Sequence, residues 1–128
     1  MKPITEEWIQ KAEADFATAE REIEAKGTAN YDAVCFHYQQ CAEKYIKARF
    51  CEEDIKFGKI HDLVALLEGI LQIEPLWEGF REDAAYLSDF AVSFRYPGES
   101  ADKQNAFDAQ RRCRRFRQAA RKAFDLDR

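Results

Sequence analysis

The residues best suited to chemistry lie in FRYPGES, at positions 94–100, where Arg95 and Tyr96 directly precede Pro97 and Gly98. A guanidinium offers a planar fork of donors that fits a phosphate, and it stays protonated throughout the usable pH range. A tyrosine ring can stack on a base, but a phenol with a pKa of about 10 is a poor base. Arg95 and Tyr96 are therefore predicted to bind a phosphate or nucleotide, and they are weaker candidates for catalysis.

Proton transfer near neutral pH would call for a histidine, and the chain has two, His37 and His61. His37 lies beside the apolar stripe of a predicted helix, which favours a partly buried ring bonded to a neighbour. His61 stands at the start of another predicted helix, where it could cap the helix or brace the loop. Both remain weak catalytic candidates beside Arg95 and Tyr96, because the sequence does not place them relative to Arg95.

A second candidate surface is the arginine-rich segment RRCRRFRQAARK at 111–122. Such a segment can follow a phosphate backbone, and Arg111, Arg114 and Arg115 can share one broad helical face. The segment 6–24 is rich in acids, so a first helix packed alongside could neutralise the same charge. The sequence leaves both roles open for Arg111, Arg114 and Arg115.

Composition limits the class of protein. The chain has 128 residues, 46% of them hydrophobic and 34% charged, with a net charge of −4, which is typical of one globular domain over 1–128. No apolar run is long enough to cross a bilayer, and the first residues do not resemble a signal peptide. We therefore expect a cytoplasmic protein without membrane association.

The four cysteines are isolated in helical patterns, and no C-x-x-C pair is present. Free, buried thiols are the favoured interpretation, and neither a metal site nor a cofactor is expected. The cysteines are Cys35, Cys41, Cys51 and Cys113.

Apolar residues recur at three- and four-residue steps in five segments, which predicts five helices. Thr5 is expected to cap the first, over 5–26, and Asn30 the second, which ends within 51–54. A short third helix opens at 61 or 62, a fourth runs over 75–94, and the last begins at 101 or 102. Short connections then predict an all-α fold, an antiparallel four-helix up-and-down bundle with one additional short helix.

Three segments in this order resemble the small prokaryotic HEPN domains. They are YDAVCFHYQQCAEKYIKA at 31–48, KIHDL at 59–63 and RYPG at 95–98, and the resemblance extends back to WIQKAEADF at 8–16. It implies a helical bundle that forms a homodimer. Many such proteins act beside a minimal nucleotidyltransferase as a toxin–antitoxin pair, and others cleave RNA.

The ribonuclease motif of that family pairs an arginine with a histidine shortly after it. Arg95 matches the arginine, but the histidine would stand at 100, 101 or 102, where this chain has Ser100, Ala101 and Asp102. An arginine alone can hold an anion but cannot act as the base. The half-present motif therefore favours binding over catalysis.

Three functions remain open. The favoured one is a dimeric binding and regulatory component that works with a nucleotidyltransferase partner and holds nucleotide or RNA phosphate near Arg95. The alternatives are an atypical metal-independent endoribonuclease that uses Arg95, and a structural helical dimer without a ligand, in which FRYPG only ends a helix. Phe36, Phe94 and Phe107 are expected at the dimer interface.

Overall fold

The computed structural model describes residues 1–90 and 97–126 of the chain. These residues form a helical bundle without strands, which confirms the predicted all-α fold. In chain order the elements are α1 (Pro3–Ile23), α2 (Tyr31–Glu52), α3 (Leu63–Ile70), the 3₁₀ helix η1 (Pro75–Phe80), α4 (Arg81–Asp89) and α5 (Lys103–Ala123). No helix of the described residues is both long and apolar enough to span a bilayer.

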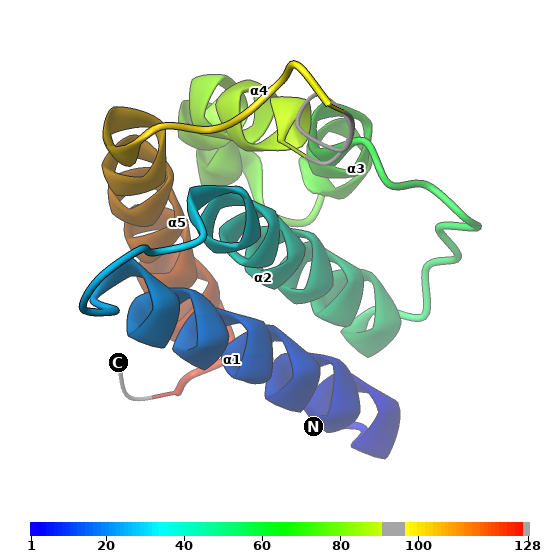
Figure 1. The fold of residues 1–128 in the computed structure, drawn as a ribbon. Coiled ribbons are helices and arrows are strands. Elements are labelled where there is room, and N and C mark those ends of the chain that lie inside the picture. Colours follow the sequence, from blue (N-terminus) through cyan, green and yellow to red (C-terminus); the bar gives the residue numbers. More distant parts are fainter. Residues whose placement is uncertain (91–96, 127–128) are drawn as a thin grey trace.

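The bundle is organised around α2. Figure 1 shows α1 running alongside α2, with α5 behind the pair and α3 and α4 along another side of α2. Because α2 meets all these neighbours, apolar side chains around much of its circumference are buried, among them Tyr38, Tyr45 and Ile46. All four cysteines are free thiols, and only Cys51 is partly exposed.

Side-chain caps fix the starts of three helices. The Asn30 carboxamide oxygen accepts from the Ala33 amide at 3.0 Å, and the Asp62 carboxylate accepts from the Val64 amide at 3.0 Å. Asp102 opens α5 with a reciprocal capping box to Asn105. These starts agree with the sequence: Asn30 is the predicted cap, and Asp62 and Asp102 are each one of the two boundary residues predicted for their helices.

The first helix differs from its prediction at both ends. It begins at Pro3, so Thr5 lies inside the first turn and is fully buried instead of acting as the cap. Proline fits the first turn because its missing N–H has no helical acceptor there. The helix ends at Ile23, three residues before the predicted end, and Gly27 takes a positive φ of 93° in the turn that follows.

The fourth element departs most from its prediction, which is one long helix over 75–94. Residues Pro75–Phe80 wind into the 3₁₀ helix η1, and α4 covers only Arg81–Asp89. Residues three apart eclipse each other in a 3₁₀ helix, so Trp77 and Phe80 both meet Phe116 of α5, with ring centroids at 5.0 and 5.2 Å. The described bundle thus has three long and two short α-helices, and positions 91–94 lie outside the described residues.

Hydrogen bonds anchor the described segments on both sides of residues 91–96. On the α4 side, the Leu63 amide donates to the Ser88 hydroxyl at 2.8 Å, which joins the last turn of α4 to the start of α3. On the α5 side, the Ala101 amide donates to the Asp32 carboxylate in the first turn of α2 at 2.6 Å. The two anchors hold the end of α4 and the start of α5 against α3 and α2.

Candidate functional site

Three of the predicted functional residues, Phe94, Arg95 and Tyr96, lie outside the described residues. The described segment that leads to them is the end of α4, which is bonded through Ser88 to Leu63. His61 stands two residues before Leu63 in the chain. The surroundings of His61 are therefore the described part of the molecule that bears most directly on a site near Arg95.

His61 is an exposed histidine held by a buried carboxylate. Its Nδ1 lies 3.3 Å from Oε2 of Glu43, and its side chain is 72% exposed while that of Glu43 is 4% exposed. A neutral imidazole that donates its Nδ1 proton to a carboxylate presents Nε2 as an acceptor. The pair can therefore orient a base or hydrogen-bond donor toward solvent.

Glu43 belongs to a line of buried polar side chains on α2. Its Oε1 accepts from the Gln39 carboxamide and its Oε2 from Lys47 Nζ, both at 2.9 Å. Gln39 is fully buried, and the Lys47 side chain is 6% exposed. We call Gln39, Glu43, Lys47 and the exposed His61 the α2 row.

Buried charges of this kind are expensive unless they are paired and hydrogen-bonded. The α2 row meets that condition, since Glu43 has three polar neighbours. Lys47 Nζ also lies 5.7 Å from the centroid of the Trp8 ring and 5.5 Å from that of Phe57, within cation–π range. A fully satisfied network buried against one exposed imidazole is an arrangement suited to positioning that imidazole.

Glu43, Lys47 and Gln39 were not identified from the sequence as functional candidates. Glutamine, glutamate and lysine are usually exposed residues, whereas Gln39, Glu43 and Lys47 are all buried. The available signal was the four-residue spacing from Gln39 through Glu43 to Lys47, which places the three side chains in line on one helix.

His37 forms a second, separate contact with a carboxylate. Its Nδ1 lies 2.7 Å from Oδ1 of Asp15 in α1, whose Oδ2 accepts from Lys44 Nζ at 2.5 Å. The His37 side chain is 29% exposed, so the predicted partly buried ring bonded to a neighbour is confirmed. The two histidines bind different carboxylates, so no contact of described residues joins His37 to the α2 row.

The predicted phosphate-binding arginines of α5 point to carboxylates of the same chain. Arg114 donates to both oxygens of Glu20 in α1, at 2.6 and 3.2 Å. Arg115 donates to both oxygens of Asp83 in α4, at 2.7 and 2.5 Å. Among the described residues, Arg111 pairs only with Asp108 of its own helix, at 3.3 Å, and its side chain is 55% exposed.

Further pairs tie α5 to α1. Arg117 donates to both oxygens of Glu13, at 2.8 and 2.6 Å. Burial alone would raise the pKa of Glu13, but hydrogen bonds from Arg117 and Tyr45 and the charge of Arg117 outweigh burial and lower it. We call Glu13, Glu20, Arg114 and Arg117 the α1–α5 seam.

The same balance holds at Glu20. Burial would raise its pKa, but hydrogen bonds from Arg114, Tyr38 and Gln110 lower it. The acidic first helix therefore pairs with much of the arginine charge of α5, which is one of the two roles that the sequence leaves open. Arg111 differs from Arg114 and Arg115, because among the described residues it pairs with no carboxylate of another helix.

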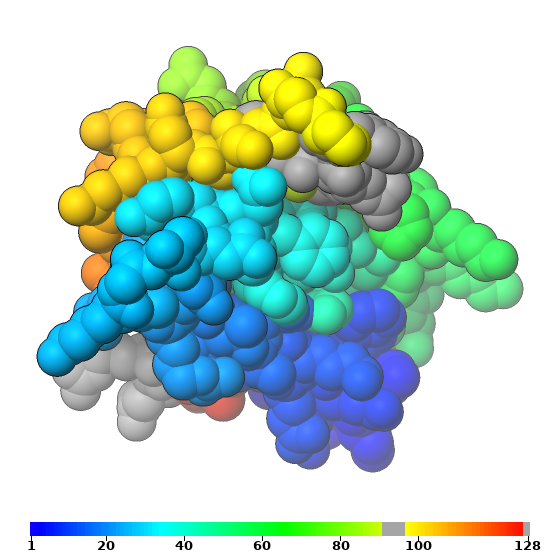
Figure 2. All heavy atoms as spheres, in the orientation of Figure 1, coloured from blue at the N-terminus to red at the C-terminus, as the bar shows by residue number. Residues whose placement is uncertain are grey.

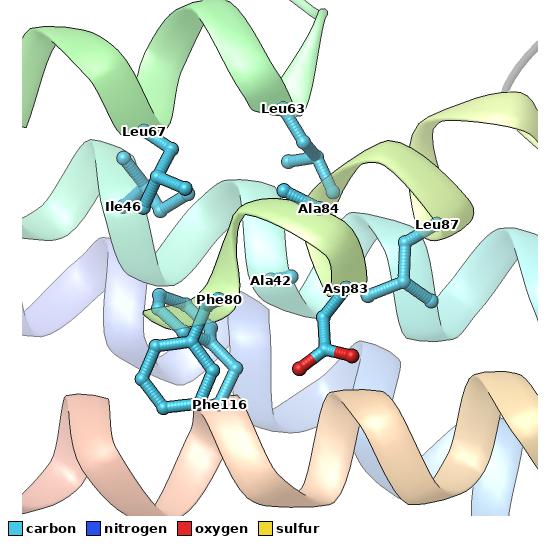
Figure 3. Close-up of a pocket in the computed structure, with 9 residues that line it drawn as sticks. All are labelled: Ala42, Ile46, Leu63, Leu67, Phe80, Asp83, Ala84, Leu87 and Phe116. Atoms are coloured by element: carbon cyan, nitrogen blue, oxygen red, sulfur yellow. The ribbon is translucent and has the colours of Figure 1, made fainter. Parts of the chain in front are cut away.

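An enclosed apolar cavity lies between α2, α3, α4 and α5, and Figure 3 shows the side chains around it. Its volume is about 10 Å³, roughly the space of one water molecule. The Asp83 carboxylate at its edge turns toward α5 (Figure 3), where Arg112 and Arg115 bind it. The cavity is a small gap in the packing and has no room for a nucleotide.

Two of the three aromatic residues predicted at a dimer interface are described, and both are partly exposed. Phe36 is 38% exposed and Phe107 is 43% exposed. Phe36 packs edge-on against His37, with ring centroids 5.3 Å apart. Figure 2 shows that the first half of α2 reaches the surface between α1 and residues 97–102, so an interface there stays a prediction.

Comparison with known proteins identifies one family. No curated protein and no solved structure matches the chain. The HEPN domain, in contrast, matches residues 5–123, which is nearly the whole chain and includes every α-helix except the first two residues of α1. The chain belongs to the HEPN domain family.

Proposed function

We propose that this HEPN-type protein is a dimeric binding and regulatory component of a toxin–antitoxin-like pair. It works with a nucleotidyltransferase-family partner and holds nucleotide or RNA phosphate near Arg95. The observation that supports a ligand site is the α2 row, in which the buried Glu43 holds the exposed His61. His61 stands two residues before Leu63, whose amide bonds Ser88 in the last turn of α4, and Arg95 follows the end of α4 at Asp89 by six residues.

The ion pairs that α5 arginines make with α1 and α4 favour Arg95 over the arginine-rich helix as the main phosphate ligand. Arg114 and Arg115 would have to give up Glu20 and Asp83 before they could bind a phosphate. Arg111 remains as an auxiliary contact because it is exposed and its one ion pair with a described residue is to Asp108. A protonated His61 supplies a further donor to an anion that Arg95 holds.

Binding is tested by fluorescence anisotropy with a labelled single-stranded RNA and with a labelled ATP analogue. We expect Arg95→Ala to weaken binding about tenfold, the loss of one charge-assisted pair. Arg111→Ala, at the auxiliary contact, should weaken binding by less than about threefold, and Arg21→Ala in α1, outside the proposed site, is the matched control that should leave affinity unchanged. Equal affinity of Arg95→Ala and the unchanged protein would overturn the proposed site.

A salt series separates phosphate binding from other modes. For contacts to phosphates, log Kd should rise linearly with log salt concentration, and the slope reports the number of phosphates neutralised. Binding that is absent even at low salt would leave the structural dimer without a ligand as the remaining function.

The dimer and the partner are tested separately. HEPN domains often dimerise, and we propose that Phe36 and Phe107, with Phe94, form the contact. Sedimentation equilibrium should give twice the 14.9 kDa chain mass, and Phe36→Ser should shift it toward the single chain. Co-expression with a nucleotidyltransferase encoded next to this gene should give a complex that survives affinity purification, and a lack of any complex counts against the regulatory pair.

A second function, metal-independent cleavage of RNA, is favoured by the contact between Glu43 and His61. In that function His61 Nε2 takes the proton of a ribose 2′-hydroxyl and the 2′-oxygen bonds to phosphorus. The bond from phosphorus to the 5′-oxygen breaks, and water protonates that oxygen. His61 would thus replace the histidine that is missing at 100–102.

Incubation with tRNA or mRNA tests the endoribonuclease. Cleavage that is lost in both His61→Ala and Arg95→Ala, with His37→Ala as the matched control, would establish it. Cleavage that persists in His61→Ala removes His61 from the mechanism, and no cleavage by the unchanged protein ends the enzymatic function.

A further inference from the structure

We propose that the groove between the start of α1 and the loop after α2 binds an acidic amphipathic helix of a partner protein. This site goes beyond the proposed function, because it shares neither Arg95 nor His61. The groove has a volume of about 550 Å³ and is lined by Ile4, Cys51, Ile55, Lys56 and Phe57, among others. A further hollow of about 120 Å³ continues from Ile4 along α1.

The two walls of the groove are held together by polar contacts at the end of α2. The Lys2 amide donates to the Glu52 carboxylate at 3.0 Å, and Lys2 Nζ binds Asp54. These contacts join the start of α1 to the end of α2, whose connection to α3 projects from the bundle in Figure 1. The groove is therefore formed before any partner binds.

Its floor is apolar and packed. The Phe57 ring lies 6.0 Å from that of Trp8 and 5.6 Å from that of Phe50, measured between centroids. Ile4 of α1 lines the groove and is 49% exposed, and Ile60, three residues after Phe57 in the loop, is 39% exposed. Apolar side chains at this density on a surface favour contact with another apolar face.

The charge around the groove points to an acidic occupant. Lys11 and Lys56 line the hollows and Lys59 follows in the loop, and none of these three forms an ion pair with a described residue. Asp54 is already paired with Lys2, and the acids beside the groove that have no ion pair with a described residue are Glu7 and Glu52. The three lysines outnumber these two acids, so the rim carries a net positive charge in a chain whose net charge is −4.

This rim contrasts with α5, where Arg114, Arg115 and Arg117 are all bound to carboxylates. Lysines without partners around an apolar floor match a helix with an apolar stripe and carboxylates on its flanks. No strand edge is present in the described ranges 1–90 and 97–126, so a partner cannot extend a sheet there. A helix in the groove is the mode that these surfaces support.

The test uses two fluorescein-labelled peptides of about 16 residues, roughly four helical turns. Both carry Leu at positions i, i+3, i+4 and i+7, and their flanking residues are Glu in one and Lys in the other. Titration of the full chain at low salt, read by anisotropy, should show binding of the Glu peptide. The Lys peptide should bind at least about tenfold more weakly, because its charge repels the rim.

Variants locate the binding. Reversal of the two lysines that line the hollows, in Lys11→Glu/Lys56→Glu, should weaken binding of the Glu peptide at least about tenfold, and Ile4→Asp should abolish its binding. The matched control, Lys26→Glu/Lys122→Glu, reverses two lysines that also lack ion pairs with described residues and lie outside the groove. The control should leave binding unchanged, and circular dichroism confirms that each variant is folded.

Several outcomes would overturn the inference. They are no binding of the Glu peptide, equal binding of both peptides, or equal effects of the rim and control variants. Dissociation of a dimer by Ile4→Asp would assign the groove to a second copy of this chain. Binding of a labelled single-stranded RNA that is lost in the rim variant, without peptide binding, would assign it to nucleic acid.

Discussion

The α2 row and the α1–α5 seam both hold acids against bases, but they do so in different surroundings. In the α2 row the side chains of Glu43 and Lys47 are 4% and 6% exposed. In the seam, Glu20 and Arg114 are 27% and 51% exposed. Exposed pairs contribute little stability, whereas a buried charge that loses its partner is strongly destabilising. The seam therefore joins two helices through exposed contacts that each contribute little, while the stability of the α2 row depends on its buried charges, Glu43 and Lys47.

The largest effect is expected for Glu43→Ala. It leaves the Lys47 ammonium buried without a carboxylate, and we expect a loss of about 3–5 kcal/mol in the free energy of unfolding, measured in urea by circular dichroism. The matched control is Glu53→Ala, since Glu53 also pairs with a base four residues away, Arg49, but is exposed. That control should lose less than about 1 kcal/mol.

A double variant checks that the loss comes from an unpaired charge. Glu43→Leu/Lys47→Met replaces both charges by apolar groups, so it should be less destabilised than Glu43→Ala. If the double variant loses more than the single one, the packing around the α2 row and not its charge balance sets the stability.

The next largest effect is a loss of stability at acid pH, which we expect from the carboxylates of the α1–α5 seam. The folded-state pKa values of Glu13 and Glu20 lie below their ordinary value of 4.5. Their contribution to the free energy of unfolding is therefore complete above pH 4.5, and it is lost as the pH falls through the lowered pKa values. The urea midpoint should therefore fall between about pH 5 and pH 3. Glu13→Gln/Glu20→Gln should flatten this fall, and an unchanged profile would contradict the assignment.

A smaller effect is expected for Arg114→Ala. Its guanidinium is half exposed and shares Glu20 with Tyr38 and Gln110, so we expect a loss of about 0.5–1 kcal/mol in the free energy of unfolding. Most of that loss should disappear in about 1 M NaCl, where surface charges are screened. A loss that is independent of salt would mean that packing of the side chain, and not its charge, is responsible.

The smallest change in stability is expected for His61→Ala. Its ring is 72% exposed, and Glu43 keeps Gln39 and Lys47 as partners, so the change should stay within about 0.5 kcal/mol. If the α2 row positions His61 for a ligand, the same variant weakens RNA or nucleotide binding. A large loss of stability together with unchanged binding would make His61 a structural residue.

The three long helices could be predicted from the sequence because local rules specify them. Asn30 and Asp102 offer cap oxygens to the first turn, and both do so in the structure. The apolar spacing of α5 likewise identifies the side that is buried, including Ala106, Cys113 and Phe116. These signals act within a few residues, so they do not need the rest of the fold.

Features that depend on a partner helix were harder to predict. The 3₁₀ turn at Pro75–Phe80 follows from the position of Phe116, a residue about forty places further along the chain, to which both Trp77 and Phe80 turn. The burial of Glu43 likewise requires Lys47, Gln39 and the loop that carries His61 at the same place. Pairing between Glu20 and Arg114 was one of two open alternatives, because only packing decides which helices lie side by side.

The bonds that flank residues 91–96 have a consequence for engineering. Ser88 binds the start of α3, and Asp32 binds the Ala101 amide, so each flank is fastened to a helix by its own contact. Phe90 belongs to the core, so a library would vary only positions 91–97 and keep both of these bonds. Such a library would test whether the site proposed near Arg95 can be given other ligands while its flanks stay unchanged.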